Sequence, residues 1–143
     1  MRTNILVIGG SPAGIVATLT SKQANKEVTV ARRGKFVVVP CGIPYIFGTL
    51  RSVEKDRIPD EVLTKNNVNL VIDVVVDVDL KDEVARLRCD DNISFEKPVL
   101  AIGSNPSISP IGGVDLENVF LVYKDPEHLS EILKAINECE RIG

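Results

Sequence analysis

Apolar runs separated by polar or glycine-rich breaks organise the first part of the chain. Residues 4–8 and 27–31 are such runs, and they are typical of strands buried on both faces of a parallel sheet. Residues 13–24 between them predict a helix, with Pro12 tolerated in its first turn and Ser11 as a candidate N-cap. Together the three segments predict a β-α-β unit with a right-handed crossover.

The next segments are shorter and more irregular. An apolar run at 36–39 predicts a strand that ends at Pro40. Residues 41–48 are apolar but contain two glycines and a proline, so they predict a short helix or turn packed against another part of the chain. A short helix is predicted at 60–66, directly behind Pro59.

The remaining chain predicts mainly strands. Valines alternate with aspartates over 70–80, which indicates one strand with a solvated face. Further strands are predicted at 84–88 and 93–95, as parts of a meander, and at 99–102 and 119–122. A final amphipathic helix is expected behind Asp125, with Pro126 at its first position. The order of elements predicts an α/β fold with a parallel sheet and a small antiparallel meander.

Composition narrows the class of protein. The 143 residues are 44% hydrophobic and 26% charged, which is typical of one globular domain. A net charge of −3 argues against a nucleic-acid or anionic-membrane binder, because both need a basic surface. No apolar run approaches the ~20 residues of a membrane span, and the start lacks a signal-peptide pattern. We therefore expect a soluble cytoplasmic protein that binds neither nucleic acid nor membrane.

Cysteine and histidine usage limits the possible metal and disulfide chemistry. The three cysteines, Cys41, Cys89 and Cys139, are too far apart in sequence for a local disulfide framework or a CxxC metal site. His128 is the single histidine, so no histidine metal cluster is expected. The settings of Cys89 and Cys139 predict structural roles as small buried hydrophobes.

The glycine-rich stretch from Gly9 to Gly14 lies between the first predicted strand and helix. In this position the first glycine makes the tight turn, the last lets helix pack on strand, and the helix N-terminus faces a pyrophosphate. Ser11 takes the place of the middle glycine of the GxGxxG fingerprint. The stretch therefore predicts dinucleotide binding, and the alternative is a plain strand–helix turn.

Arg32 stands where the fingerprint usually has an acidic residue for the ribose hydroxyls. An arginine can only donate hydrogen bonds, so it suits a 2′- or 3′-phosphate, as in NADP or coenzyme A, better than a diol. The alternative is that Arg32 points into solvent, as expected for Arg33 beside it.

Cys41 lies between proline and glycine in an apolar segment. Flanking residues of this kind favour a fixed turn that presents the sulfur, whereas the alternative is a small buried hydrophobe. We expect Cys41 to be the most reactive of the three thiols, near the start of a short helix.

Three motifs resemble one family across essentially the whole chain. Residues 8–14 are similar to its FAD pyrophosphate fingerprint, 41–48 to its redox-cysteine segment, and 100–106 to the ATGxxP motif, with Ile102 in place of threonine. The family is that of the FAD-dependent pyridine nucleotide–disulfide oxidoreductases. The chain looks most like the single-cysteine branch, which contains NADH oxidases, NADH peroxidases and coenzyme A-disulfide or persulfide reductases.

The resemblance implies a Rossmann-like, three-layer FAD-binding fold. It implies that FAD receives electrons from NAD(P)H, bound by a domain absent from this chain, and passes them to catalytic Cys41. The implied cofactor-binding residues are Gly9, Ser11, Pro12, Ala13, Gly14, Arg32, Arg33, Pro40, Cys41, Val75, Ala101, Gly103 and Ser104.

The resemblance also implies a division of the chain and possible partners. Residues 1–110 are similar to the FAD-binding segment, and 111–143 to a strand and helix that lead into the NAD domain. A second chain carrying the NAD and dimerisation domains is one implied partner, and a homodimer is another. The alternatives are a non-catalytic nucleotide-binding module and a subunit of a split enzyme.

Overall fold

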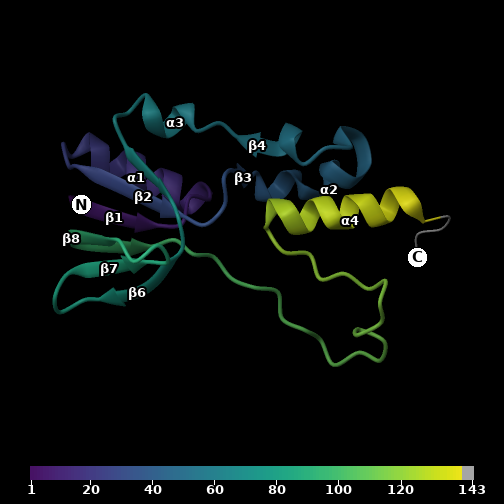
Figure 1. Ribbon diagram of the computed structural model, residues 1–143. Helices are drawn as coiled ribbons and strands as arrows, with labels where there is room; N and C mark the ends of the chain where they lie inside the picture. The colour runs from purple at the N-terminus through teal and green to yellow at the C-terminus, as the bar shows by residue number, and fades with distance from the viewer. Residues whose placement is uncertain (140–143) are drawn as a thin grey trace. The chain divides into compact units, whose positions relative to one another are not determined.

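In the computed structural model, which describes residues 1–139, six strands form one sheet in the order β5-β2-β1-β8-β7-β6 (Figure 1). Strands β5, β2, β1 and β8 are parallel, whereas β8, β7 and β6 are antiparallel. The strands are β1 (Arg2–Ile8), β2 (Val28–Arg32), β5 (Asn69–Ile72), β6 (Val75–Asp79), β7 (Val84–Leu87) and β8 (Asn92–Leu100). The α/β fold with a parallel sheet and an antiparallel meander is confirmed.

The described chain divides into two units. The first unit contains Met1–Val37 and Pro59–Gly103, and the second contains Val38–Ile58 and the residues from Ser104 onward. The whole six-stranded sheet belongs to the first unit, together with the helices α1 (Pro12–Gln23) and α3 (Glu61–Thr64).

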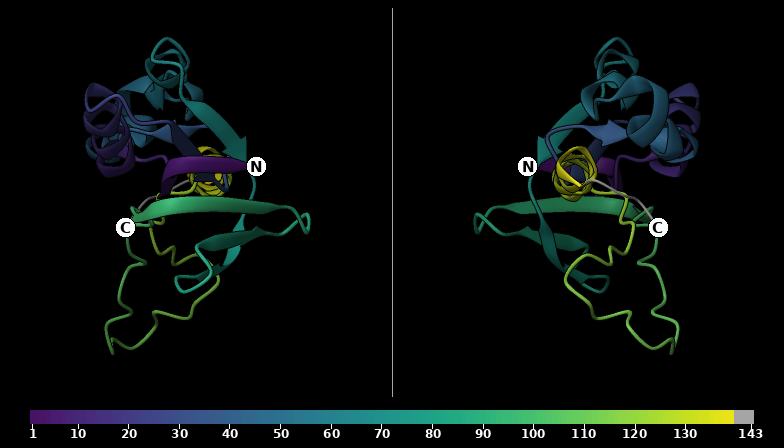
Figure 2. Two further views of the ribbon diagram at one scale, coloured as in Figure 1. Left: turned by 90° about the vertical axis from the view of Figure 1, so that its left-hand side faces the viewer. Right: turned by 90° about the vertical axis from the view of Figure 1, so that its right-hand side faces the viewer.

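Two apolar clusters make the first unit a three-layer structure. Alternate side chains of β1 face opposite sides of the sheet. On one side, Leu6 and Ile8 pack on Leu87 of β7 and Phe95 of β8. Val7 instead packs in a second cluster, which includes Leu63 of α3 and Ile15 of α1. Figures 1 and 2 show the two helices on one side of the parallel strands and β6 and β7 on the other. The predicted three layers are therefore present.

One strand replaces two that the sequence predicted separately. Strand β8 runs without a break from Asn92 to Leu100, because it pairs with β1 from Arg2↔Ser94 to Ile8↔Leu100. Pro98 lacks an N–H but is tolerated here. Strand β7 pairs only with the first three residues of β8 and leaves the edge at Pro98 open.

The predicted strand at 70–80 is wrong as a single element, because the structure has β5 and β6 there. The break lies at Asp73, whose carboxylate accepts hydrogen bonds from the backbone N–H groups of Val74 (2.6 Å) and Cys89 (3.2 Å). Aspartate side chains that bond nearby backbone groups in this way compete with the ladder bonds of a continuous strand.

The second unit contains short elements and one long helix. Strands β3 (Val37–Val38) and β4 (Arg57–Ile58) form a two-stranded sheet. Between them the chain is largely helical: η1 (Pro40–Gly42), α2 (Ile43–Tyr45), η2 (Ile46–Leu50) and η3 (Glu54–Asp56). Ile43 and Ile46 are buried, so the prediction of a packed helical segment at 41–48 is confirmed.

The long helix of the second unit is α4 (Pro126–Glu138). The Asp125 side chain accepts hydrogen bonds from the N–H groups of Glu127 and His128, both at 3.1 Å, which confirms the predicted cap. Helices of the described residues are too short or too polar to cross a membrane.

The predicted strand at 119–122 is wrong, because these residues form neither helix nor strand. Within the described residues no strand pairs with this segment, and a strand needs such a partner. The N–H of Val119 bonds instead to the carbonyl of Leu116 at 3.0 Å, and the Leu121 carbonyl contacts the His128 ring Nε2 at 2.7 Å.

Candidate functional site

The glycine turn after β1 packs directly against the end of β8. Gly9 has a φ of +111°, and its N–H donates to the Ala31 carbonyl at 2.8 Å. A Cβ atom at Gly9 would overlap the carbonyl of Ala101, and one at Gly14 would overlap the carbonyl oxygen of Gly9. Only hydrogen fits at these two positions, so the turn can bring α1 close to β1 and β8.

The start of α1 offers backbone N–H groups to a ligand. Pro12, its first residue, has no N–H, and the first intrahelical bond runs from Ile15 to the Ser11 carbonyl at 3.0 Å. The N–H groups of Ala13 and Gly14 therefore have no carbonyl acceptor within the helix. They lie at its N-terminal end, where the helix dipole favours an anion. Ser11 occupies the N-cap position as predicted, but its hydroxyl makes no capping bond.

Arg32 ends β2 with its side chain against Gly10, where a Cβ would lie 2.8 Å from Arg32 Cδ. The residue is 4% exposed, so the alternative that it points into solvent is wrong. Its guanidinium pairs with both carboxylate oxygens of Asp60, at 2.6 and 2.9 Å. It also donates to the carbonyls of Gly34 (3.0 Å) and Lys35 (2.6 Å).

These four hydrogen bonds use four of the five N–H groups of Arg32. The single N–H that remains on Arg32 cannot bind a phosphate in the bidentate way that makes arginine selective for phosphate. The structure therefore gives Arg32 an internal role beside the glycine turn, which weakens the expectation of selectivity for phosphorylated adenosine. Sequence reasoning missed Asp60, because nothing in the local sequence marks it as the partner of a residue 28 positions away.

The other predicted cofactor residues are spread over both units. Ala101 contacts the glycine turn, and Gly103 follows it with a φ of +70°. Val75 packs on the apolar cluster of the meander, and Arg33 is exposed. Ser104 and Pro40 belong to the second unit. Whether these residues contact a cofactor stays a prediction.

Cys41 lies in the middle of η1 and is exposed, so the alternative of a buried hydrophobe is wrong. Cys89 and Cys139 are also exposed free thiols, which contradicts their predicted burial. Cys89 lies in the turn between β7 and β8, and Cys139 follows the last residue of α4, where turns and helix ends leave side chains in solvent.

The thiol of Cys89 has a raised pKa, and Asp73 is the main cause. A hydrogen bond between the Cys89 side chain and the Asp73 carboxylate favours the neutral thiol and raises its pKa. The same contact lowers the pKa of Asp73. Since the thiolate is the reactive form, Cys89 is held in its less reactive state at neutral pH.

Asp56 is a second residue that sequence reasoning missed. It is 8% exposed, its Oδ2 has no hydrogen-bond partner, and burial raises its pKa. Its carboxyl lies against Gly42, the residue after Cys41. Lysine, arginine and glutamate surround Asp56 in sequence, and such a polar stretch gives no signal of burial.

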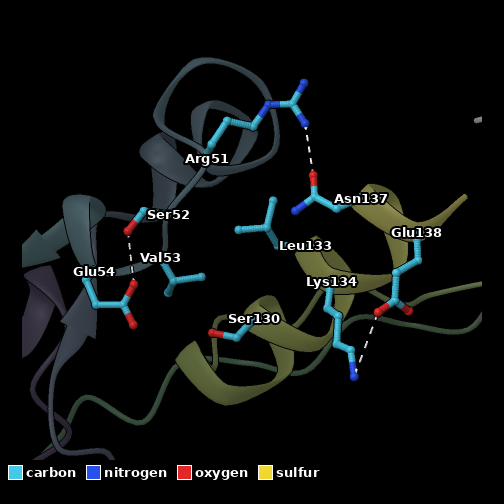
Figure 3. A pocket seen from close by; sticks show the side chains of 9 residues that line it. All are labelled: Arg51, Ser52, Val53, Glu54, Ser130, Leu133, Lys134, Asn137 and Glu138. Carbon is cyan, nitrogen blue, oxygen red and sulfur yellow. Dashed lines mark hydrogen bonds and ion pairs between the residues drawn. The ribbon is translucent and has the colours of Figure 1, made fainter.

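A hollow of about 390 Å³ lies between the segment 51–54 and α4 of the second unit (Figure 3). Seven of its nine lining residues are polar or charged, and Arg51 donates to the Asn137 side chain across it at 3.2 Å. Val53 and Leu133 are its two apolar lining residues. None of the predicted site residues lines this hollow, so it lies outside the candidate cofactor site.

The glycine turn at the start of α1, set between parallel strands, defines an α/β protein of the Rossmann type. The match to a family model over residues 3–142 then shows that the chain belongs to the pyridine nucleotide-disulphide oxidoreductase family.

Curated relatives agree with this family. An NADH oxidase of Methanocaldococcus jannaschii is 30% identical over 96% of this chain and 34% of its own length. An NAD(P)H coenzyme A polysulfide/persulfide reductase of Pyrococcus horikoshii is 28% identical over 91% of the chain and 31% of its own length. The chain thus spans about a third of the curated relatives it matches.

Solved structures show the same fold. The NADH:rubredoxin oxidoreductase of Clostridium acetobutylicum matches 94% of this chain and 35% of its own, with a TM-score of 0.76 and 18% identity. The water-forming NADH oxidase of Lactobacillus brevis matches 97% of this chain and 33% of its own, with a TM-score of 0.74 and 22% identity.

Proposed function

We propose that this chain is the FAD-binding portion of a flavin-dependent NAD(P)H oxidoreductase, with Cys41 as its redox-active sulfur. The observation that carries the proposal is the packing of Gly9 and Gly14 on Ala101. This packing places the start of a 12-residue helix next to the turn after β1, as the pyrophosphate of a dinucleotide requires. The names of the relatives, which include NADH oxidases and a persulfide reductase, support the redox chemistry.

The residues at the turn fit a dinucleotide cofactor. The N–H groups of Ala13 and Gly14 can donate to pyrophosphate oxygens. The Ser11 hydroxyl, which makes no capping hydrogen bond, can do the same. When bound, a flavin supplies the two-electron chemistry that links a nicotinamide to a sulfur. Cys41 is exposed, so a disulfide, persulfide or peroxide can reach it. Its thiolate attacks one sulfur of a disulfide, forms a mixed disulfide and releases the other sulfur as a thiolate.

Titration of the chain with ADP, followed by backbone amide NMR, tests the nucleotide site even if binding is weak. We expect the amide signals of Ala13 and Gly14 to shift with ADP, because their N–H groups face the diphosphate. Adenosine, which lacks the diphosphate, is the matched control and should leave these signals in place. Shifts from ADP that avoid Gly9–Gly14, or no shifts at millimolar ADP, would contradict the nucleotide-binding role.

Cys41 should react before the other two thiols when the native chain is alkylated with iodoacetamide. We expect Cys41 to react faster than Cys89, because Asp73 raises the Cys89 pKa and lowers its thiolate fraction. Mass spectrometry of peptides from timed samples measures the three rates. Asp73→Asn is the control, and it should speed the reaction of Cys89 while leaving Cys41 unchanged. Earlier labelling of Cys89 or Cys139 would contradict the redox role of Cys41.

The predicted partners remain proposals. Apolar side chains are exposed along the segment 102–122, including Ile102 (72%), Ile111 (67%) and Leu116 (64%). Exposed apolar groups in this number favour contact with further polypeptide, either a second chain or a second copy. The cytoplasmic location is likewise a prediction from the sequence.

A further inference from the structure

A buried carboxyl lies under the turn that carries Cys41. Asp56 is the last residue of η3 and is 8% exposed, and its Oδ2 lacks a hydrogen-bond partner. A Cβ atom at Gly42 would overlap Asp56 Oδ1 and would lie 2.6 Å from its Cγ. The carboxyl therefore packs on the bare Cα of Gly42, the residue that follows Cys41.

Asp56 contacts the other end of the same turn through its backbone. The N–H of Val39 donates to the Asp56 carbonyl at 3.0 Å, and the N–H of Gly42 donates to the Val39 carbonyl at 2.8 Å. The second bond closes a turn from Val39 to Gly42 with Cys41 inside it, and the first bond joins the start of this turn to Asp56. One residue thus holds both the entry and the exit of the turn.

Packing alone does not explain a carboxyl at this position. A buried polar group without a partner costs free energy, and an apolar side chain of similar size avoids that cost. Burial raises the pKa of Asp56, and the Val39 N–H offsets this in part. The other two residues of η3, Glu54 and Lys55, are exposed, so of the two acidic side chains in this short helix only that of Asp56 faces inward.

We propose that Asp56 is a positioning residue for Cys41: its carboxyl packs on Gly42, its backbone carbonyl accepts from the Val39 N–H, and the two contacts together fix the turn that presents the thiol. The proposal rests on the redox role proposed for Cys41. It assigns to Gly42 a matching role, since any side chain there displaces the carboxyl. The pair therefore acts as one unit, in which an acidic residue of η3 sets the orientation of a sulfur in η1.

The test measures the reactivity of Cys41 alone, in a chain carrying Cys89→Ser and Cys139→Ser. The probe is 4,4′-dithiodipyridine, whose reaction with thiols is followed by absorbance, in native buffer and in urea. We expect Cys41 to react faster in the native chain than in the chain unfolded by urea. In Asp56→Ala and Gly42→Ala the native rate should fall to within about twofold of the unfolded rate, because the thiol is no longer held.

A conservative variant and a neighbour serve as controls. Asp56→Asn keeps the size and one oxygen of the side chain, so it should retain the native rate. Glu54→Ala removes an exposed carboxylate of the same short helix and should also retain it. Circular dichroism checks that each variant is folded. If neither Asp56→Ala nor Gly42→Ala folds, Asp56→Ser, which is too short to reach Gly42, takes their place with the same expected fall in rate.

The possible results separate the two proposals. Equal native rates in the parent and in Asp56→Ala, both above the unfolded rate, overturn the role of Asp56 and leave that of Cys41. A native rate in the parent no higher than the unfolded rate overturns the role of Cys41. A lower native rate of Cys41 in Asp56→Ala, together with the parent rate in Asp56→Asn, supports the positioning role. A general loss of stability would not separate these two variants in their folded states.

Discussion

Gly9→Ala is expected to destabilise the first unit by more than about 4 kcal/mol, which is a large part of the roughly 5–15 kcal/mol that holds a domain together. Two effects add at this position. The φ of +111° is unfavourable for any residue with a side chain, and the new Cβ would overlap the backbone of Ala101. Backbone atoms of two adjacent parallel strands cannot move apart without breaking the sheet. Urea unfolding followed by circular dichroism measures the loss.

Two other glycines separate the effect of backbone strain from that of overlap. Gly103 has a φ of +70° but no atom within 4 Å of a Cβ, so Gly103→Ala should cost only about 1 kcal/mol. Gly112 has neither feature, and Gly112→Ala should stay within about 0.5 kcal/mol of the parent. A cost for Gly9→Ala as small as that for Gly103→Ala would mean that the turn does not pack on Ala101.

Asp60→Ala is expected to lower the free energy of unfolding by about 3–5 kcal/mol, because it leaves the guanidinium of Arg32 buried without its counter-ion. Urea unfolding measures this loss. The Arg32 side chain is 3% exposed, and the two carbonyl oxygens that remain bonded to it carry no formal charge. Arg32→Met should cost less, since the Asp60 side chain is 22% exposed and can take up water. Glu61→Ala, at the exposed carboxylate next to Asp60, is the matched control and should have little effect.

The double variant Arg32→Met with Asp60→Ala completes this test. Its cost should be clearly smaller than the sum of the two single costs, because it leaves no unpaired charge in the interior. Additive costs would show that the two side chains do not interact in solution. Arg32→Glu would place a carboxylate next to Asp60 in place of the ion pair, so this variant should unfold the first unit before it can improve the binding of a ribose.

Local patterns were sufficient to predict the elements that frame the glycine turn. The apolar runs on either side of α1 and the glycines after β1 act over a few residues, so their structural meaning can be read directly from the sequence. The cap at Asp125 was predictable for the same reason, since it involves only the next three residues. The family resemblance added the three-layer arrangement, which periodicity alone does not specify.

Contacts between distant residues were not predictable in this way. Arg32 has the sequence position of a ligand-binding residue, but its contacts depend on Asp60, which lies in the turn before α3. Asp56 contacts Gly42, which lies 14 positions earlier in the chain, and Asp73 interrupts a valine-rich pattern by bonding to the backbone of Cys89. The run at 119–122 has the composition of a strand, but no described strand supplies its partner.

Strand β1 is made before its two neighbours in the sheet, which are themselves made at very different times. Strand β2 follows it after one helix, whereas β8 is complete only at Leu100. During synthesis the growing chain therefore carries one edge of β1 unpaired until nearly all of the first unit has left the ribosome. Such an open edge can pair with other chains, and long-range parallel pairing is slow to form. The interval before β8 emerges is therefore the period in which a nascent chain has most need of protection from its neighbours.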